Sequence, residues 1–373
     1  MRKLVCALTL VVTAALTLPP AVAGPTQGGV TSDNVEYVAH VNTEIGTATG
    51  MKVIGRYLYI TSWKSFAFYD VKDPLNPELV SVTPFGFKFE NEDVATNGKI
   101  MLFSEQLPQN ILHVWDVEDP ANPEEIAALD GGGGHTSECV LDCSYSYSST
   151  GTIVDLRKPS APKIVGNWGK GMPATGAHDL NEVGPGLVLS SSRPIVYLDA
   201  RKNPAKPSLV AVGDDDRITG GIHSNRWPNQ AKDDFVMFSS ESNATGRCTG
   251  TNGAFMTWDA TQYKKTHAFK LIDIFQLSNG TYTDGAPPVN GLGCSAHWFQ
   301  EHPSFEDGGL VALGSYEHGT RFVDISDKGK IKEIGYFVPW GGSTSAAYWL
   351  NDEIVYAVDY SRGIDILRFT GKP

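Results

Sequence analysis

The chain has 373 residues, of which 41% are hydrophobic and 19% are charged, and its formal net charge at pH 7 is −12. This composition supplies a large core and excludes an intrinsically disordered protein. The acidic balance, without any run rich in Lys and Arg, argues against nucleic acids and anionic membranes as partners, because both require clustered cations.

The N-terminus has the pattern of an export signal. A positive start, an apolar stretch and a small-residue cleavage pattern follow one another at Arg2-Lys3, Leu4–Leu18 and Ala21-Val22-Ala23. Residues 1–23 are therefore predicted to be a signal peptide and residues 24–373 the mature protein, which would be secreted or held at the cell surface. An uncleaved membrane anchor is the alternative, but the apolar stretch is short for that role. No other segment is a candidate membrane span.

A short polar sequence recurs along the mature chain. Asp70-Val-Lys-Asp-Pro-Leu-Asn-Pro77 is repeated as Asp116-Val-Glu-Asp-Pro-Ala-Asn-Pro123, and weaker copies follow at 155–162 and 199–207. The leading aspartate recurs about every 49 residues, at Asp70, Asp116, Asp155, Asp199, Asp259, Asp324 and Asp365. Such a period predicts one supersecondary unit copied several times, with Asp, Asn and Pro forming a turn in each copy.

Short segments rich in β-branched and aromatic residues surround each copy. In the first unit they are Tyr57–Ile60, Phe66–Tyr69 and Glu78–Val82, and a less regular segment precedes the turn at 55–56. No helical period runs through the mature chain. Because four short antiparallel strands form a propeller blade, the predicted fold is all-β, a seven-bladed β-propeller in a single domain.

The two ends of the mature chain predict how the ring closes. The chain ends on a strand at Ile364–Phe369 that no strand follows, and it begins with a strand at Glu36–His40 that has no blade before it. The N-terminal strand is therefore expected to complete the last blade and to remove an exposed sheet edge. The fifth and sixth units are long, with predicted insertions at 239–253 and 277–293.

The repeat resembles the LVIVD-repeat family of bacterial and archaeal exported proteins, which are predicted β-propellers. The pattern Val-x-Asp-Val-x-Asp-Pro-x-Asn-Pro followed by an apolar strand is clearest from Val114 to Ala128. The resemblance extends over most of the mature chain, although only the first two copies match the repeat pattern closely. It implies a propeller fold and export, and it implies no activity.

Four cysteines remain once the signal peptide and Cys6 are removed. In an exported chain this number favours two disulfides over free thiols. Cys139 and Cys143 could clip a tight turn, and Cys248 and Cys294 would tie an insertion to a later strand. A cysteine metal site is the alternative, which the C-x3-C spacing without a second such pair does not favour.

Histidines occupy one position in four consecutive units, at the start of the predicted innermost strand. They are His135, His178, His223 and His297, and Glu92 takes the same place in the second unit. Equivalent positions of propeller blades converge at the mouth of the central channel, so the pattern predicts a transition-metal site for Fe, Cu or Zn. The placement resembles in outline the four-histidine iron site of propeller carotenoid oxygenases and the copper site suggested for selenium-binding-protein or methanethiol-oxidase propellers. Neither motif is matched further, so no activity is implied.

A structural role for these histidines is the alternative. WD-repeat blades carry a Gly-His pair at a related place, where the histidine bonds an aspartate of its own blade. Repeats also keep residues because they were copied. The surroundings of the four histidines match poorly, so copying alone does not account for them.

The turns that follow the second strand of each unit should lie on the same face as the histidines. They carry Trp63, Glu105, Glu241, Glu317 and His318. Glutamate and histidine near a metal serve as proton carriers, and we predict Glu92 and His318 as catalytic residues. Trp298, beside His297, would form a wall of the site. The acidic run at 214–216 offers oxygen ligands for Ca²⁺, although a solvated loop explains it better.

Two functions follow from these observations. The first is a metal-dependent oxidoreductase or oxygenase that acts on a small molecule, with the four histidines as ligands and Glu92 as a fifth ligand or a base. The second is a non-catalytic exported scaffold that binds a protein or a glycan through its long insertions. In either case we expect a monomer. The sequence contains no nucleophile elbow, His-Glu-x-x-His, Walker sequence or dinucleotide fingerprint.

Overall fold

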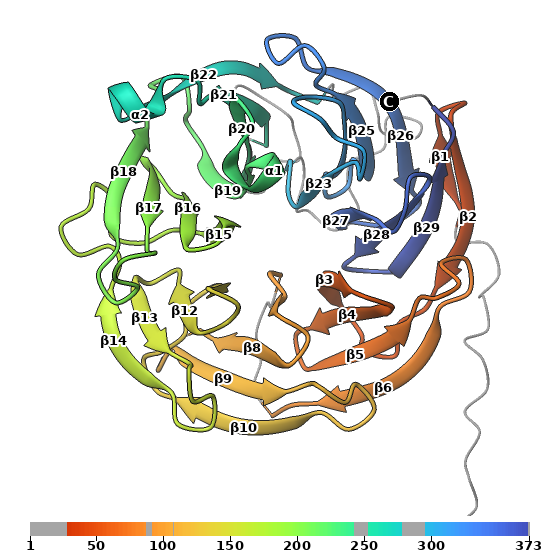
Figure 1. Ribbon diagram of the computed structural model, residues 1–373. Helices are drawn as coiled ribbons and strands as arrows, with labels where there is room; N and C mark the ends of the chain where they lie inside the picture. The colour runs from red at the N-terminus through yellow and green to blue at the C-terminus, as the bar shows by residue number, and fades with distance from the viewer. Residues whose placement is uncertain (1–27, 87–91, 107, 242–252, 278–294, 372–373) are drawn as a thin grey trace, which may run out of the picture.

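The computed structural model describes residues 28–86, 92–106, 108–241, 253–277 and 295–371. The predicted signal peptide, most of both insertions, Cys248 and Cys294 lie outside these ranges, so the predictions on them stay predictions. Figure 1 shows the strands arranged in sheets around a common centre. The fold is all-β and a β-propeller, as predicted.

The first three sheets are antiparallel meanders of consecutive strands. Their strands are β3 (Ala48–Ile54), β4 (Tyr57–Ser62), β5 (Ser65–Asp70) and β6 (Glu78–Pro84); β7 (Ala95–Thr96), β8 (Ile100–Glu105), β9 (Ile111–Asp116) and β10 (Glu124–Leu129); and β11 (Ser137–Val140), β12 (Tyr145–Ser148), β13 (Thr152–Asp155) and β14 (Lys163–Asn167).

An eight-stranded sheet follows, in which two four-stranded meanders are joined by parallel pairing of β18 with β22. Its strands are β15 (Asp179–Gly184), β16 (Leu187–Ser191), β17 (Ile195–Asp199), β18 (Ser208–Gly213), β19 (Gly221–Arg226), β20 (Phe235–Glu241), β21 (Phe255–Asp259) and β22 (Ala268–Phe275). Two short helices, α1 (Pro228–Ala231) and α2 (Tyr263–Thr266), lie in its connections.

The last two sheets combine both ends of the described chain. One contains β1 (Gly29–Thr31), β23 (Phe299–Glu301), β24 (Leu310–Gly314), β25 (Thr320–Asp324) and β26 (Lys332–Pro339), and the other contains β2 (Val35–Val41), β27 (Thr344–Trp349), β28 (Ile354–Asp359) and β29 (Gly363–Phe369). Hydrogen bonding thus divides the described strands into six sheets. The count of seven blades stays a prediction, which depends on treating the eight-stranded sheet as two units.

Closure of the ring occurs as the sequence predicts. β2 pairs antiparallel with β29 from Val35–Phe369 to Val41–Ile364, so an N-terminal strand completes the sheet of the C-terminal strands. β1, which the sequence analysis did not predict, adds a further antiparallel pair to β26. Together the two strands cover edges that would otherwise be open to pairing with other chains.

The recurring polar sequence forms turns between the third and fourth strands of a unit. In the first copy, Asp73 accepts hydrogen bonds from the Leu75 amide N–H at 3.0 Å and from the Asn76 side chain at 2.9 Å. Asp119 makes the same two contacts in the second copy, with Ala121 and Asn122. The predicted turn chemistry is therefore confirmed, and so is the predicted disulfide between Cys139 and Cys143, which closes the turn between β11 and β12.

Asp359, at the end of β28, gives the folded state a predictable pH dependence. Its Oδ1 accepts the Ser361 amide N–H at 2.8 Å, whereas its buried Oδ2 has no hydrogen-bond partner among the described residues. Burial, with the neighbouring Asp365, raises the pKa of Asp359 to about 6. Between about pH 4 and pH 6 the folded chain thus holds a proton that the unfolded chain has released, so stability falls as pH rises, by up to about 3 kcal/mol.

We expect Asp359→Asn to remove this loss, because asparagine keeps the Oδ1 acceptor and carries no charge. Urea unfolding of both proteins at pH 4, 5, 6 and 7 measures the effect. The variant should match the natural chain at pH 4 and exceed it at pH 7. Parallel pH profiles for the two proteins would contradict the assignment.

Candidate metal centre

The five residues singled out by the repeat come together at the starts of inner strands. Glu92 precedes β7, His135 precedes β11, His178 directly precedes β15, His223 lies in β19 and His297 precedes β23. Each of these strands is an end strand of its four-stranded meander or sheet, and β15, β19 and β23 lie toward the centre in Figure 1. Residues more than 200 positions apart in the sequence therefore share one site.

The four imidazoles form a continuous row. The ring centroids are 4.3 Å apart for His135 and His178, 3.9 Å for His178 and His223, and 3.8 Å for His223 and His297. The Nε2 atoms of His135 and His178 are 2.8 Å apart. The row extends past His297 to Tyr316, whose ring centroid is 4.6 Å away.

Hydrogen bonds between neighbouring units hold this row in place. The Thr136 hydroxyl donates to the His178 carbonyl oxygen at 2.8 Å, and the Ser224 hydroxyl donates to the His297 carbonyl oxygen at 2.8 Å. Two imidazoles take part themselves, since Nδ1 of His178 donates to the His223 carbonyl oxygen at 3.1 Å and Nδ1 of His297 to that of Ser345 at 2.7 Å. These bonds fix the ring orientation and leave Nε2 of His178 and His297 as the nitrogen with a lone pair.

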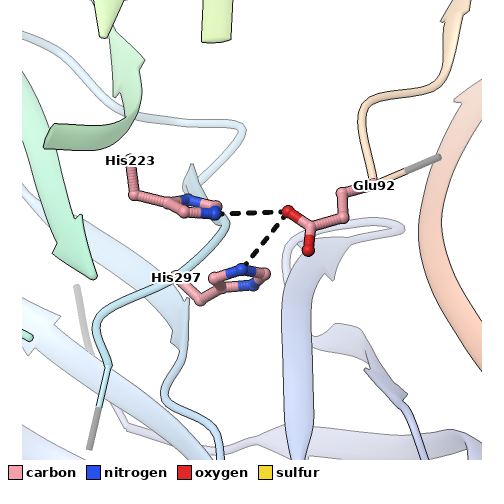
Figure 2. A group of neighbouring side chains, drawn as sticks. All are labelled: Glu92, His223 and His297. Atoms are coloured by element: carbon pink, nitrogen blue, oxygen red, sulfur yellow. Dashed lines mark hydrogen bonds and ion pairs between the residues drawn. The ribbon is translucent and has the colours of Figure 1, made fainter. Parts of the chain in front are cut away.

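Glu92 is the carboxylate of the site, and Figure 2 shows two imidazoles directed at one of its oxygens. Its Oε2 lies 3.2 Å from Nε2 of His223 and 3.3 Å from Nε2 of His297. Trp298 Nε1 donates to the same oxygen at 3.1 Å, and the Tyr360 hydroxyl donates to Oε1 at 2.8 Å. The predicted contact of Trp298 with the site is thus present.

The electrostatics of the site follow from burial and from these contacts. Burial alone would raise the pKa of Glu92, but His297 and His223 outweigh it and hold the pKa well below its ordinary value. Burial tends to lower the pKa of His297, and the charge of Glu92 reverses this and raises it. Burial and the neighbouring imidazoles lower the pKa of His178 and of His223, so both rings favour the neutral form that binds metals.

A cation is needed between Glu92 and His297. Because Nδ1 of His297 donates its proton to Ser345, a neutral ring would turn the lone pair of Nε2 toward the negative Oε2 of Glu92 at 3.3 Å. Two acceptors at that distance repel each other unless a proton or a metal ion lies between them. Nδ1 of His223 is also buried and has no hydrogen-bond partner among the described residues.

The described side chains form three groups that can hold a metal ion. They are Glu92 with His223 and His297, Glu92 with His135 and His178, and Glu241 with His178 and His223, and within each group the ligand atoms lie within 4.8 Å of one another. Imidazole and carboxylate ligands in this mixture suit Fe, Cu and Zn. The residues present therefore fit a transition metal.

A pocket of about 460 Å³ opens onto part of this centre. It is lined by Glu92, Gln106, His135, Ala177, His178, Glu241 and Tyr316. The Tyr316 hydroxyl donates to Oε1 of Glu241 at 2.7 Å, which fixes that carboxylate at the pocket wall. His135 and His178 are half-buried, whereas Glu92, His223 and His297 are buried.

Buried carboxyls that the sequence analysis did not single out adjoin the centre. Asp93 follows Glu92 and shares a side-chain hydrogen bond with Glu138, while both oxygens of Asp179, next to His178, have no hydrogen-bond partner among the described residues. Burial and Asp93 raise the pKa of Glu138 to about 8, and burial with the other two acids raises the pKa of Asp179 well above its ordinary value. Lys52 and Arg226 supply positive charge beside them.

The remaining predicted residues have different positions. His318 is buried in the turn between β24 and β25 and belongs to none of the three groups, so its catalytic role stays a prediction. Glu241 belongs to one group, Glu105 lies 3.4 Å from the imidazole of His113, and Trp63 is 48% exposed.

The sequence analysis did not identify Tyr316 and Tyr360 as residues of the site. Both tyrosines follow the second strand of a unit, close to the positions of Glu105 and Glu241 in other units. An alignment of the repeats could therefore have identified them as candidates for the site.

Comparison with known proteins supports the fold. Residues 45–83 match the family model described as the LVIVD repeat, as the sequence predicts, and none of the curated proteins compared with the chain matches it. Among solved structures, the chain is similar to "YCF48 bound to D1 peptide", with 11% identity, a TM-score of 0.55 and coverage of 92% of this chain and 99% of that one. It is also similar to "Crystal structure of RRP9 WD40 repeats", with 10% identity, a TM-score of 0.58 and coverage of 92% and 98%. At these identities the likeness concerns the fold alone.

Neither helix in the described ranges has the length and apolar character that a membrane crossing requires.

Proposed function

We propose that this chain is an exported, metal-dependent oxidoreductase that acts on a small molecule at the mouth of the propeller channel. His135, His178, His223 and His297 would be the metal ligands and Glu92 a further ligand or a base. The observation that carries the proposal is the convergence of two imidazole nitrogens on one carboxylate oxygen, since Oε2 of Glu92 lies 3.2 Å from Nε2 of His223 and 3.3 Å from Nε2 of His297.

The arrangement of ring nitrogens favours a metal over a purely structural role. A histidine that binds a metal through one nitrogen usually donates its other N–H to a carbonyl or a carboxylate. His178 and His297 both do so. A structural histidine gains most from two satisfied nitrogens, whereas Nδ1 of His223 is buried without a described partner.

The pocket supports chemistry on a small molecule. Its volume of about 460 Å³ lies in the usual range for small-molecule sites. A bound iron or copper ion would supply one-electron chemistry there, and zinc a Lewis acid. Glu241, oriented by Tyr316, lies where it could accept or return a proton. His318, two residues after Tyr316, would act as a second proton carrier.

Two observations support export. The Cys139–Cys143 disulfide is of a kind that persists in oxidising compartments, and the matched LVIVD repeat agrees with an extracytoplasmic location. The predicted signal peptide at 1–23 and the single mature domain at 24–373 complete the proposal.

Metal analysis tests the proposed function. The full chain, purified without a histidine tag, should contain at least one equivalent of a transition metal by elemental analysis, and His223→Ala/His297→Ala should contain less. The control is His267→Asn, which changes an exposed histidine in the left-handed C-cap of α2, a conformation that asparagine tolerates. A natural chain that folds but binds no transition metal would refute the metalloenzyme.

A non-catalytic scaffold is the second candidate, favoured by exposed aromatic side chains. Trp340, after β26, is 59% exposed, and Trp63, between β4 and β5, is 48% exposed. Exposed tryptophans are common anchors in protein interfaces, and one structural neighbour is described as bound to a peptide. The ligand would be a protein or a glycan, and this candidate predicts no stoichiometric metal.

A further inference from the structure

We propose that the centre holds two metal ions with Glu92 between them. Glu92, His223 and His297 would bind an inner ion, and Glu92, His135 and His178 an outer ion. The inference rests on the proposed function in assuming metal binding, and it adds the number of ions, their ligands and their different access to solvent.

The residues that the three ligand groups share indicate that two ions can bind at once. The groups that define the inner and outer ions share Glu92 alone, and together they contain all five residues. A carboxylate has two oxygens and can bridge two cations, whereas a neutral imidazole has one lone pair. The third group reuses His178 and His223, so it can be occupied only in place of the other two.

Each set is complete enough to bind an ion and open enough to react. Two imidazoles and one carboxylate form a three-ligand set that leaves positions free for water or substrate. Metals in two-metal sites lie about 3.5–4 Å apart. The neighbouring rings of the two sets, His178 and His223, have centroids 3.9 Å apart, so the two sets lie side by side.

The two ions would differ in access. Of the inner set, His223 is 1% exposed and His297 is 0% exposed, and neither lines the pocket. Both histidines of the outer set are half-buried and line the pocket together with Glu92. Substrate therefore meets the outer ion, and the inner ion exchanges slowly because its ligands are closed off from solvent.

A second carboxylate adjoins the two sets. Glu241 lies within reach of His178 and His223, so it adds negative charge beside the proposed ions.

A titration of the chelator-stripped full chain with Zn²⁺, and separately with Co²⁺, tests the proposal. The natural chain should bind two equivalents. One equivalent should bind to each of the double variants His135→Ala/His178→Ala and His223→Ala/His297→Ala. Two equivalents should bind to the control His267→Asn. EDTA should remove one equivalent from the loaded natural chain about tenfold faster than the other, and the slow one should be the equivalent that remains in the His135→Ala/His178→Ala variant.

The outcomes separate this inference from the proposed function. One equivalent in the natural chain would overturn the second ion and leave the metalloenzyme intact, whereas no binding would overturn both. Two equivalents that persist in His135→Ala/His178→Ala would place the second ion elsewhere and also refute the proposal. Circular dichroism checks that each variant is folded. If His135→Ala/His178→Ala misfolds, the single variant His135→Ala, which changes a half-buried side chain, replaces it. This variant should also lose the metal equivalent that EDTA removes faster.

Discussion

Replacement of Glu92 by glutamine is expected to remove most of the stabilisation that a bound metal gives to the folded chain. Glu92 belongs to two of the three ligand groups, and a neutral amide is a much weaker ligand than a carboxylate. A ligand present at 1,000 times its dissociation constant stabilises the folded state by about 4 kcal/mol. The natural chain should therefore gain about this amount on loading, and Glu92→Gln should gain much less, since only the group of Glu241, His178 and His223 stays intact.

Glutamine is suited to this test because it keeps the shape of the side chain. Its amide oxygen can still accept from Trp298 or Tyr360, which hold the two carboxylate oxygens in the natural chain. Urea unfolding with and without added Zn²⁺ measures the gain. Glu124→Gln, an exposed change in β10 of the same sheet, is the matched control and should retain the full gain. An equal gain in Glu92→Gln would remove Glu92 from the ligand set.

The strands and the closure could be predicted because they depend on local and periodic signals. The β-branched and aromatic segments of β4 and β5 lie where the sequence analysis placed them, within one or two residues. The pairing of β2 with β29 followed from counting strands at both ends of the chain. The pairing of β18 with β22 could not be predicted in this way, since it depends on how two adjacent units sit against each other.

The site was predictable only to the extent that it follows the repeat. Glu92 and the four histidines share one repeat position, and the ring of units brings them together. Tyr316 and Tyr360 also share a position, but Glu241 occupies it in the fifth unit, so the change of residue type concealed the pattern. The buried carboxyls of Asp93, Glu138 and Asp179 were missed for another reason: their importance comes from burial, which spacing does not reveal.

Asp365→Ala should cause the largest loss of stability of any substitution considered, about 3–5 kcal/mol, because it breaks a buried ionic network at the closure of the ring. Asp365 is 1% exposed and lies in β29, opposite the closing strand β2. Its Oδ1 accepts from Nη2 of Arg362 at 2.8 Å and from Nδ1 of His40 in β2 at 2.9 Å, and its Oδ2 accepts from Nε of Arg362 at 3.0 Å. Alanine would leave the buried guanidinium without its bidentate carboxylate and would cut the link to β2.

An exposed aspartate supplies the control for this prediction. Asp116 ends β9 opposite Ile100, the first residue of β8, whereas Asp365 lies opposite Ala357 within β28. The two positions are therefore not equivalent, but Asp116 is exposed and accepts the Glu118 amide N–H at 3.0 Å, as in an ordinary turn. Asp116→Ala should therefore cost only about 1 kcal/mol. Urea unfolding at pH 7 compares the two, and equal losses would show that the buried network adds nothing to an ordinary turn. Arg362→Ala combined with Asp365→Ala should recover part of the loss, since the double variant no longer buries an uncompensated cation.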